Sequence, residues 1–267
     1  MKIVTWNVNS INVRLPHVAD YLRATGPDVL LMQETKMADD KFPVMEFEAL
    51  GYRVAMHGQK SYNGVAIASK HPIEDVITGL PGNTDDDQSR YIEATIGGIR
   101  IASLYLPNGN PVGTDKFDYK LRWMGHLHDR AADLLKQDVD FALGGDWNIA
   151  PEAEDLYDPA AFLDDAIVQP EARALWRAIN YLGLTESFRA LHAGLPEAWS
   201  YFDYQRGAWE KKHGIRIDHI LLSPRLADRL EESGIDRDER GKKQPSDHVP
   251  VWCVLRDPSR GSGQAAP

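Results

Sequence analysis

The chain has 267 residues, a formal net charge of −10 and 43% hydrophobic residues, a composition typical of a globular protein with a substantial core. The acidic balance argues against a protein that coats nucleic acid over its whole surface, although it allows phosphate contacts at one cleft. No apolar stretch is long enough to cross a membrane, and the single cysteine, Cys253, excludes an intrachain disulfide framework and fits a reducing cytoplasm.

Strand-like and helix-like segments alternate irregularly along the chain. Runs rich in Val, Ile and Tyr and bounded by Gly, Pro, Asn or Asp predict strands. These runs are Lys2–Asn7, Val29–Gln33, Arg53–His57, Gly64–Ser69, Tyr91–Ile96, Arg100–Leu106, Val139–Leu143, Ile217–Leu222 and Pro250–Leu255. Apolar residues at helical spacing predict helices over Leu15–Ala24, Lys116–Lys136 and Glu171–Leu182. Pro16 fits the first turn of the first helix. The mixed order predicts an α/β or α+β domain whose helices cover its sheets.

One domain is expected over residues 1–256. The N-terminus enters a strand pattern at once, so no leader sequence is expected, and no internal repeat or linker divides the chain. Residues 257–267, "DPSRGSGQAAP", carry no apolar side chain larger than alanine or proline and are expected to be disordered.

Polar residues recur in pairs where the predicted strands end. The pairs are Asn7 and Asn9, Glu34 and Lys36, and Asp146 and Asn148. Side chains two residues apart on extended backbone share one face, so these groups can converge on a cleft above a sheet. A single Asp or Asn at a strand end is more often a turn or capping residue, and that interpretation stays open for each residue taken alone.

A different polar pattern occurs in the last two predicted strands. Asp218 interrupts the apolar run "RIDHILL", and a buried carboxylate needs a hydrogen-bonded or charged partner. Arg216, two residues away on the same face, is one candidate partner, and His248 is the other. Asp247 and His248 are adjacent, so on extended backbone they point to opposite faces and need separate partners. A carboxylate bonded to one nitrogen of His248 would fix its tautomer and favour the imidazolium.

Eight motifs occur in order from end to end of the chain: "TWNVNSIN", "LLMQETK", "YNGVAI", "LYLPNG", "GGDWNIAP", "WSYFDY", "GIRIDHIL" and "PSDHVPV". The chain therefore resembles the exonuclease III family of apurinic/apyrimidinic endonucleases, within the deoxyribonuclease-I-like superfamily. The resemblance implies a four-layered α/β sandwich in which two packed mixed β-sheets are flanked by helices. It also implies that the motif loops gather at one end of this sandwich.

The resemblance assigns roles to particular residues. Glu34 would be the principal metal ligand, with Asn7 and Asp247 near the metal. The catalytic residues would be Tyr105, Asp146, Asn148, Asp218 and His248. Among these, Asp218 would pair with His248, Asp146 and Asn148 would contact the scissile phosphate and the attacking water, and the Tyr105 hydroxyl would touch that phosphate. Hard divalent cations prefer such carboxylates, which favours Mg²⁺, with Mn²⁺ as a substitute.

Contacts to DNA are expected around the same cleft. Tyr201 stands where many family members carry a tryptophan beside the pocket for the abasic nucleotide. Ile215 and Ile217 would line that pocket, although an isoleucine in a strand is more often simply core. Arg90 and Lys36 are the expected backbone contacts. The remaining basic residues near the motifs, Lys120 among them, are expected to be mostly solvated surface.

The resemblance predicts a cytoplasmic, monomeric, metal-dependent phosphodiesterase that does not bind membranes. Its expected partner is double-stranded DNA with abasic sites or blocked 3′ ends. It would incise the duplex 5′ to an abasic site and leave a 3′-hydroxyl, and it would also act as a 3′–5′ exonuclease and 3′-phosphatase. Two alternatives stay within the superfamily: mainly exonuclease action on duplex DNA, or a different phosphodiester substrate. The third is a catalytically inactive binding module.

Overall fold

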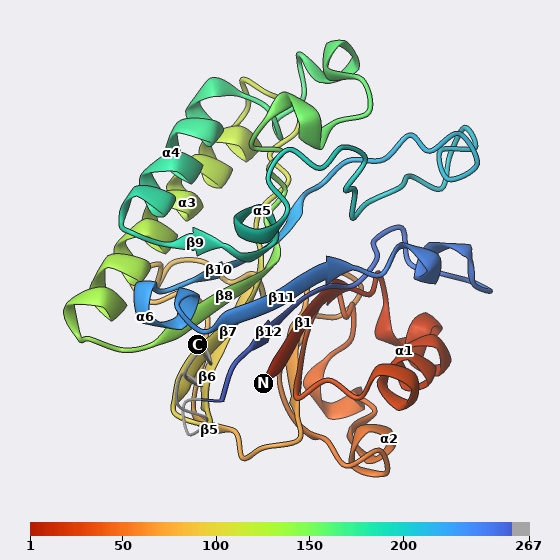
Figure 1. Cartoon of the computed structure of the whole chain (residues 1–267), viewed down its shortest axis with the longest axis vertical. Helices are drawn as coiled ribbons and strands as arrows, with labels where there is room; N and C mark the ends of the chain where they lie inside the picture. Colours follow the sequence, from red (N-terminus) through yellow and green to blue (C-terminus); the bar gives the residue numbers. More distant parts are fainter. Residues whose placement is uncertain (258–267) are drawn as a thin grey trace, which may run out of the picture.

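The computed structural model describes residues 1–257, and its strands form two six-stranded sheets (Figure 1). Sheet A has the order β11 (Leu230–Ile235), β12 (Val251–Leu255), β1 (Lys2–Asn7), β2 (Val29–Gln33), β4 (Val65–Ser69), β3 (Arg53–His57). Sheet B has the order β5 (Glu74–Thr78), β6 (Tyr91–Ile96), β7 (Ile99–Tyr105), β8 (Phe141–Asp146), β10 (Asp218–Leu222), β9 (Thr185–Glu186). Each sheet holds one parallel pair, β1–β2 or β7–β8, and is otherwise antiparallel.

Helices cover the outer face of each sheet. The α-helices are α1 (Ile11–Thr25), α2 (Val44–Glu48), α3 (Asp115–Lys136), α4 (Pro170–Tyr181), α5 (Ser187–Leu191) and α6 (Pro224–Ala227). Short 3₁₀ turns lie at Asp39–Lys41, Ala153–Asp155, Pro159–Phe162 and Arg237–Gly241. Side chains of α1 and α2 pack on sheet A, and those of α3 and α4 pack on sheet B. The predicted four-layered α/β sandwich with two mixed sheets is therefore confirmed.

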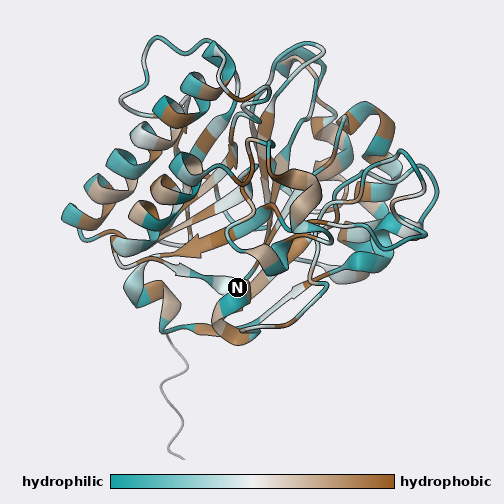
Figure 2. Ribbon diagram, turned by 90° about the horizontal axis from the view of Figure 1, so that it is seen from above, coloured by the Kyte–Doolittle hydropathy of each residue, from teal (hydrophilic) through white to brown (hydrophobic). Residues whose placement is uncertain are grey.

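The two sheets share a core of aliphatic side chains. Residues of sheet A such as Ile3 and Leu31 meet residues of sheet B such as Ile101 and Ile220, all fully buried. Hydrophobic positions, brown in Figure 2, recur along these central strands, whereas many loops around them are teal. Burial of this apolar area is the main force that holds the sheets face to face.

Close approach of the sheets requires small residues in β8. A Cβ atom on Gly144 would lie 2.6 Å from Leu31 of the facing sheet, and one on Gly145 would lie 2.0 Å from the carbonyl oxygen of Leu104. The sequence "GGD" thus lets β8 pass between its neighbours. It delivers the carboxylate of Asp146 to the end of the sheet.

Local sequence explains the helices that flank the site. In α3 the buried residues recur three or four positions apart, for example Phe117, Met124, Leu127 and Leu134, which places them on one face toward sheet B. Helix α1 ends at Thr25, and the next residue, Gly26, has a positive φ of 55° that lets its N–H donate to the Leu22 carbonyl and close the helix.

Most predicted elements lie within a few residues of the observed ones, and β1, β2, β3 and β6 match the predicted bounds. The prediction that Pro16 lies in the first turn of a helix is wrong, because α1 begins at Ile11. The proline lies inside the helix, on its exposed face. Strands β5, β9 and β11 were not predicted. They lie at the edges of the sheets, where many side chains are exposed, so their sequences contain no run of apolar residues that would predict a strand.

The predicted disordered tail lies, except for Asp257, outside the described residues, so the domain boundary at 256 stays a prediction. Within residues 1–257, no helix combines the length and apolar character that crossing a bilayer requires.

Candidate active site

Five strands deliver polar side chains to one end of the sandwich. In sheet B the register pairs Tyr105 of β7 with Asp146 of β8, and Asp146 with Asp218 of the antiparallel β10. In sheet A, Asn7 ends β1 beside Gln33 of β2, so that Glu34 follows at the same edge. The expected convergence of strand-end residues is therefore present in the fold.

Two carboxylates from different sheets face each other across a shared amide. The Asn7 Nδ2 atom donates to Glu34 Oε1 at 2.8 Å and to Asp146 Oδ2 at 3.0 Å. Lys36 is paired with the second oxygen of Glu34 at 2.8 Å and also donates to Asn9. The Asn7 side chain thus fixes the spacing of two negative groups that would otherwise repel each other.

The two carboxylates have different acidities. Burial alone would raise the pKa of Glu34, but hydrogen bonds from Asn7 and Lys36 outweigh burial and hold this pKa below its usual value. Burial raises the pKa of Asp146 to about 7, and the nearby positive charge of His248 opposes this rise only in part. Glu34 is therefore a permanent anion at neutral pH, whereas Asp146 can take up and release a proton there.

Asp218 and His248 form a buried pair. His248 Nδ1 lies 2.9 Å from Asp218 Oδ2, and the Ser200 hydroxyl donates to the same oxygen at 2.6 Å. Arg216, the other candidate partner for Asp218, is instead bound to Asp155 at 2.8 Å. Burial opposes a charge on His248, but the carboxylates of Asp218 and Asp146 outweigh it and raise the pKa of His248 to about 10.

The protonated imidazole faces the two carboxylates across the site. His248 Nε2 lies 3.6 Å from Asp146 Oδ2. The indole of Trp6 in β1 donates to the His248 carbonyl at 3.0 Å, which ties the last motif to the first strand. Because Nδ1 is engaged by Asp218, Nε2–H is the nitrogen that remains to donate to a ligand.

The two carboxylates form a candidate metal site together with His248. Glu34, Asp146 and His248 each offer a potential ligand atom, and these atoms lie within 4.8 Å of one another. A His248 that carries a proton on both nitrogens has no lone pair to give, so oxygen ligands from Glu34 and Asp146 are the better donors. Carboxylate oxygens are the ligands of hard divalent cations such as Mg²⁺.

The other two predicted metal residues lie beside this centre. The Asn7 Oδ1 atom accepts a hydrogen bond from the Asn9 backbone N–H at 3.0 Å. Asp247 Oδ1 accepts from Asn9 Nδ2 at 3.0 Å, and its side chain lines the same cavity as Glu34. Their roles toward a metal stay predictions. Asp247 and His248 do have separate partners, as their adjacency predicts.

Asn148 is held on a strained turn after β8. Its φ is +45°, and its side-chain Nδ2 donates to the Leu106 carbonyl at 2.9 Å, while Asn108 donates to its Oδ1 at 3.2 Å. Left-handed backbone at non-glycine residues is costly and recurs at functional sites. Glu34 shares this conformation, with a φ of +50°.

Lys120 packs against this turn and is an exception to the expectation that most basic residues near the motifs are solvated surface. Its side chain is fully buried, and Nζ donates to the carbonyl oxygens of Asn148 at 2.5 Å and Asn108 at 3.1 Å. Helical spacing in α3 places Lys120 on the same buried face as Phe117 and Met124. Burial lowers the pKa of this lysine to about 7.

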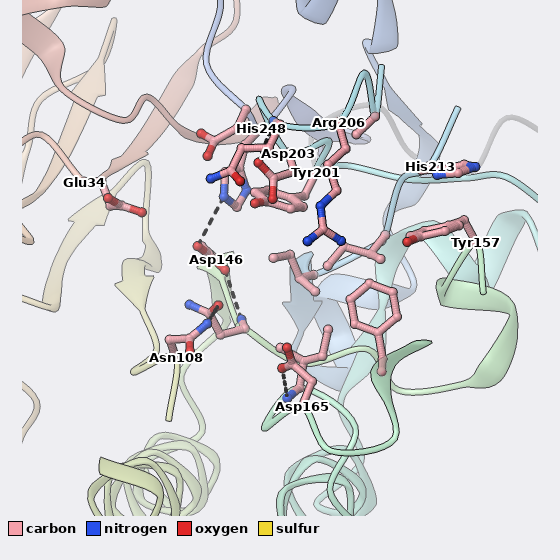
Figure 3. Close-up of a pocket in the computed structure, with 18 of the residues that line it drawn as sticks. Glu34, Asn108, Asp146, Tyr157, Asp165, Tyr201, Asp203, Arg206, His213 and His248 are labelled. Atoms are coloured by element: carbon pink, nitrogen blue, oxygen red, sulfur yellow. Dashed lines mark hydrogen bonds and ion pairs between the residues drawn. The ribbon is translucent and has the colours of Figure 1, made fainter. Parts of the chain in front are cut away.

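A cavity of about 560 Å³ opens beside the charged centre (Figure 3). Glu34, Asp146 and His248 line one part of it, and the predicted residues Tyr105, Asn148, Tyr201, Ile215 and Ile217 line it as well. Ile215 and Ile217 belong to a small apolar cluster against which Tyr201 packs. The ring of Tyr201 also meets the edge of His248, with ring centroids 4.9 Å apart.

The other predicted DNA contacts lie at the border of this site. The Arg90 guanidinium stacks 4.7 Å from the centre of the Tyr105 ring, and neither Arg90 nor Lys36 lines the cavity. For Tyr105, burial first and then the charges of Glu34 and Asp146 raise the pKa well above its usual value. Its hydroxyl therefore keeps its proton and can donate to an anion.

Sequence reasoning missed three supporting residues. Asn108 and Ser200 lie inside the quoted motifs "LYLPNG" and "WSYFDY", but short polar residues there carried no signal of their own. Lys120 lies in a helical pattern, where its position on the apolar face was the available signal.

Comparison with known proteins agrees with this geometry. The model of the endonuclease/exonuclease/phosphatase family matches residues 4–248. The exodeoxyribonuclease III of Haemophilus influenzae is 32% identical over 280 residues, which cover 96% of this chain and 100% of the relative.

Two solved structures are also closely similar. A 3′ phosphatase from Neisseria, bound to a product DNA hairpin, has a TM-score of 0.93 and 40% identity, over 96% of this chain and 100% of that one. An AP endonuclease from Archaeoglobus fulgidus has a TM-score of 0.91 and 37% identity, over 96% of this chain and 99% of that one.

Fold, converging carboxylates and full-length similarity thus lead to one assignment. The chain belongs to the endonuclease/exonuclease/phosphatase family and, within it, to the exonuclease III and AP endonuclease group of hydrolytic nucleases.

Proposed function

We propose that this nuclease is a Mg²⁺-dependent DNA-repair enzyme that incises duplex DNA 5′ to abasic sites and leaves a 3′-hydroxyl. It would also process 3′ ends, with Mn²⁺ able to replace Mg²⁺. The observation that carries the proposal is the cavity with an apolar wall, formed in part by Ile215 and Ile217, which opens directly onto Glu34, Asp146 and His248. An extruded nucleotide without a base is cheap to accommodate there, since nothing has to be unstacked.

The charge and protonation state of each site residue determine the role it would have in phosphodiester hydrolysis. Glu34 and Asp146 would hold the divalent ion, which would neutralise negative charge on the phosphate when bound. Nε2–H of His248 and the Tyr105 hydroxyl would donate hydrogen bonds to the phosphate oxygens, where charge develops in the transition state. Asp146 would also orient the attacking water, by accepting a hydrogen bond through the carboxylate oxygen that does not hold the ion.

Asp218 acts indirectly. By accepting from Nδ1 it orients the ring of His248 and favours its charged form. Asn148, held by Lys120 and Asn108, would bind the attacking water or the phosphate on the other side of Asp146. A cytoplasmic location and a monomeric state remain predictions.

The test compares three duplexes side by side, each with Mg²⁺ and with EDTA. One carries an abasic site, one a recessed 3′-hydroxyl end and one a 3′-phosphate. Metal-dependent nicking of the first at a rate comparable to or above the others supports the proposal. Rapid degradation of 3′ ends without nicking of the abasic strand would instead place the enzyme among the 3′-end-processing members, of which the Neisseria 3′ phosphatase is one.

Salt dependence provides a second check. The chain is acidic overall, with a charge of −10, so its affinity for DNA must come from a local basic rim. Each phosphate contact releases counterions, and binding should therefore weaken steadily as the salt concentration rises.

A further inference from the structure

The cavity has two ends of different chemistry. Glu34, Asp146 and His248 form the charged inner end, whereas Tyr157 and His213 lie at the opposite, outer end, and the Arg206 side chain reaches into the cavity between the two (Figure 3). Apolar side chains such as Phe162 and Ile215 line the space between them. The proposed reaction involves the inner end and the apolar wall, and it assigns no function to the residues of the outer end.

The outer end holds two rings stacked face to face. Tyr157 and His213 have ring centroids 4.3 Å apart and planes that differ by 5°. Phe162 meets Tyr157 edge-on at 5.6 Å and 86°, which fixes the orientation of the tyrosine. The Tyr157 N–H donates to the Gly214 carbonyl at 3.1 Å, so the two loops that carry the rings are joined by their backbones. Both residues are exposed.

This arrangement leaves one face of His213 without a ring partner. Among residues 1–257 its ring stacks on Tyr157 alone. A flat, preorganised aromatic face is the surface on which nucleobases stack in proteins that bind extruded or single-stranded nucleotides, and such stacking does not depend on base identity.

Arg206 adds a positive charge that has no ion-pair partner among residues 1–257, although the Asp203 carboxylate lines the same cavity. Arg206 is exposed and lines the same cavity, and its guanidinium makes no hydrogen bond or ion pair within the described chain. An arginine fork matches the geometry of a phosphate group and can bind it through two parallel hydrogen bonds.

The cavity is also larger than a nucleotide without a base would fill. Its volume of about 560 Å³ lies within the roughly 300–1,000 Å³ of pockets that enclose drug-sized molecules. A deoxyribose phosphate without a base is smaller than such a molecule, so the inner end would leave the outer end unfilled.

We infer that the outer end is a nucleotide subsite. A base adjacent to the reacting nucleotide stacks on the free face of His213, which Tyr157 supports from behind, and Arg206 binds a phosphate of the same strand. This inference deepens the proposed function and relies on DNA as the substrate. The rival explanation is that the ring pair only joins two loops.

The test uses His213→Ala, which removes the stacking surface, and His213→Phe, which restores an aromatic face. His71→Ala, an exposed histidine in the loop after β4, is the matched control. The duplex carries a tetrahydrofuran abasic analogue with 2-aminopurine on its 5′ or 3′ side. Fluorescence is measured in EDTA, where no cleavage is expected, and kcat and KM are measured with Mg²⁺.

The wild-type protein and His71→Ala should change 2-aminopurine fluorescence on one side of the analogue. His213→Ala should abolish that change and raise KM by roughly five- to hundredfold, the loss expected for one stacked base, with kcat within about twofold. His213→Phe should recover both values. An unchanged KM and an unchanged fluorescence signal in a folded His213→Ala protein would show that the rings only join the loops.

Arg206→Gln tests the phosphate contact separately. It should weaken binding and lower the slope of log K against log salt by about 0.9, the value for one phosphate. An unaltered slope would remove Arg206 from the subsite. If the wild-type protein cut none of the duplexes, the proposed function would be wrong. The fluorescence measured in EDTA would still show whether a base stacks on His213.

Discussion

Nδ1 of His248 lies 2.9 Å from Oδ2 of Asp218, although 30 positions separate the two residues in the chain. The Ser200 hydroxyl holds the same carboxylate oxygen at 2.6 Å. With Nδ1 held by Asp218, Nε2 of His248 faces Asp146 at 3.6 Å. The ring is protonated at neutral pH, because the pKa of His248 is raised to about 10. Asp218 is buried and lies behind the histidine, so its effect on the reaction must pass through His248.

Coupling between these two residues is the first prediction. Asp218→Asn and His248→Ala should each lower kcat/KM by about 100- to 1,000-fold, the usual cost of one transition-state donor. The double variant should be little worse than His248→Ala alone, because groups that act as a unit give non-additive losses. The measurement is kcat/KM on the abasic duplex. Losses that multiply would mean that the two residues act independently.

Glu34→Gln should lose most Mg²⁺-supported cleavage at low Mg²⁺ while the fold survives. The substitution keeps the shape of the side chain but removes the charge that Asn7 and Lys36 stabilise. We expect Mg²⁺ affinity to fall by at least about tenfold, measured as the Mg²⁺ concentration for half-maximal cleavage. Glu48→Gln, an exposed glutamate of α2, serves as the control. Wild-type activity of Glu34→Gln at sub-millimolar Mg²⁺ would refute its role as a ligand.

The affinity for Mg²⁺ should rise between pH 6 and pH 8. In the metal-free protein the pKa of Asp146 is raised to about 7 from a usual value near 3.8. Below pH 7 the carboxyl is mostly protonated, so a metal ion must displace a proton and binds more weakly. Above pH 7 this cost disappears.

The same raised pKa gives a stability prediction with a defined sign. Between pH 4 and pH 7 the folded metal-free protein binds more protons at Asp146 than the unfolded chain does. The stability that the protonated carboxyl contributes to the metal-free fold is therefore lost as the pH rises through 7. Mg²⁺ should therefore raise the Tm more at pH 8 than at pH 6. Thermal unfolding with and without Mg²⁺ measures both effects. A Mg²⁺-induced rise in Tm that is equal at the two pH values would contradict the assignment of Asp146 as a ligand.

Tyr201→Ala should affect substrates unequally. Its ring packs on the apolar cluster of the cavity and against the edge of His248, where an extruded sugar would lie. Abasic incision should therefore fall by about tenfold or more, the cost of losing a stacking face, whereas removal of a 3′-phosphate should fall less. Tyr181→Ala, on the exposed side of α4, is the control. Equal losses on both substrates would make Tyr201 a structural residue.

Lys120→Met should destabilise the protein by about 2–4 kcal/mol, because it removes a buried donor that holds two backbone carbonyl groups. Those carbonyls belong to Asn108 and Asn148, so activity should fall together with stability. Urea unfolding and kcat provide the two measurements. Lys116→Met, at an exposed position one turn earlier in the first turn of α3, should change stability little. Wild-type stability of Lys120→Met would show that these two hydrogen bonds are dispensable.

Local sequence patterns determined the central elements and the polar groups at their ends. Strands β1 and β2 occupy the predicted residues because alternating or continuous apolar side chains define a buried strand by themselves. Asn7, Glu34 and Asp146 could be singled out because polar residues are conspicuous where such strands stop. The order of the motifs, through the family resemblance, also pointed to the sandwich and to most of the residues that line the site.

The tertiary structure alone decided which groups meet. Arg216 and His248 were both possible partners of Asp218 until sheet packing placed His248 beside it and Arg216 beside Asp155. The edge strands β5 and β11 and the burial of Lys120 were likewise invisible, because exposure depends on which neighbours cover a residue. The ring pair of Tyr157 and His213 joins loops 56 positions apart. Contacts of this kind arise from long-range packing, which a local pattern does not encode.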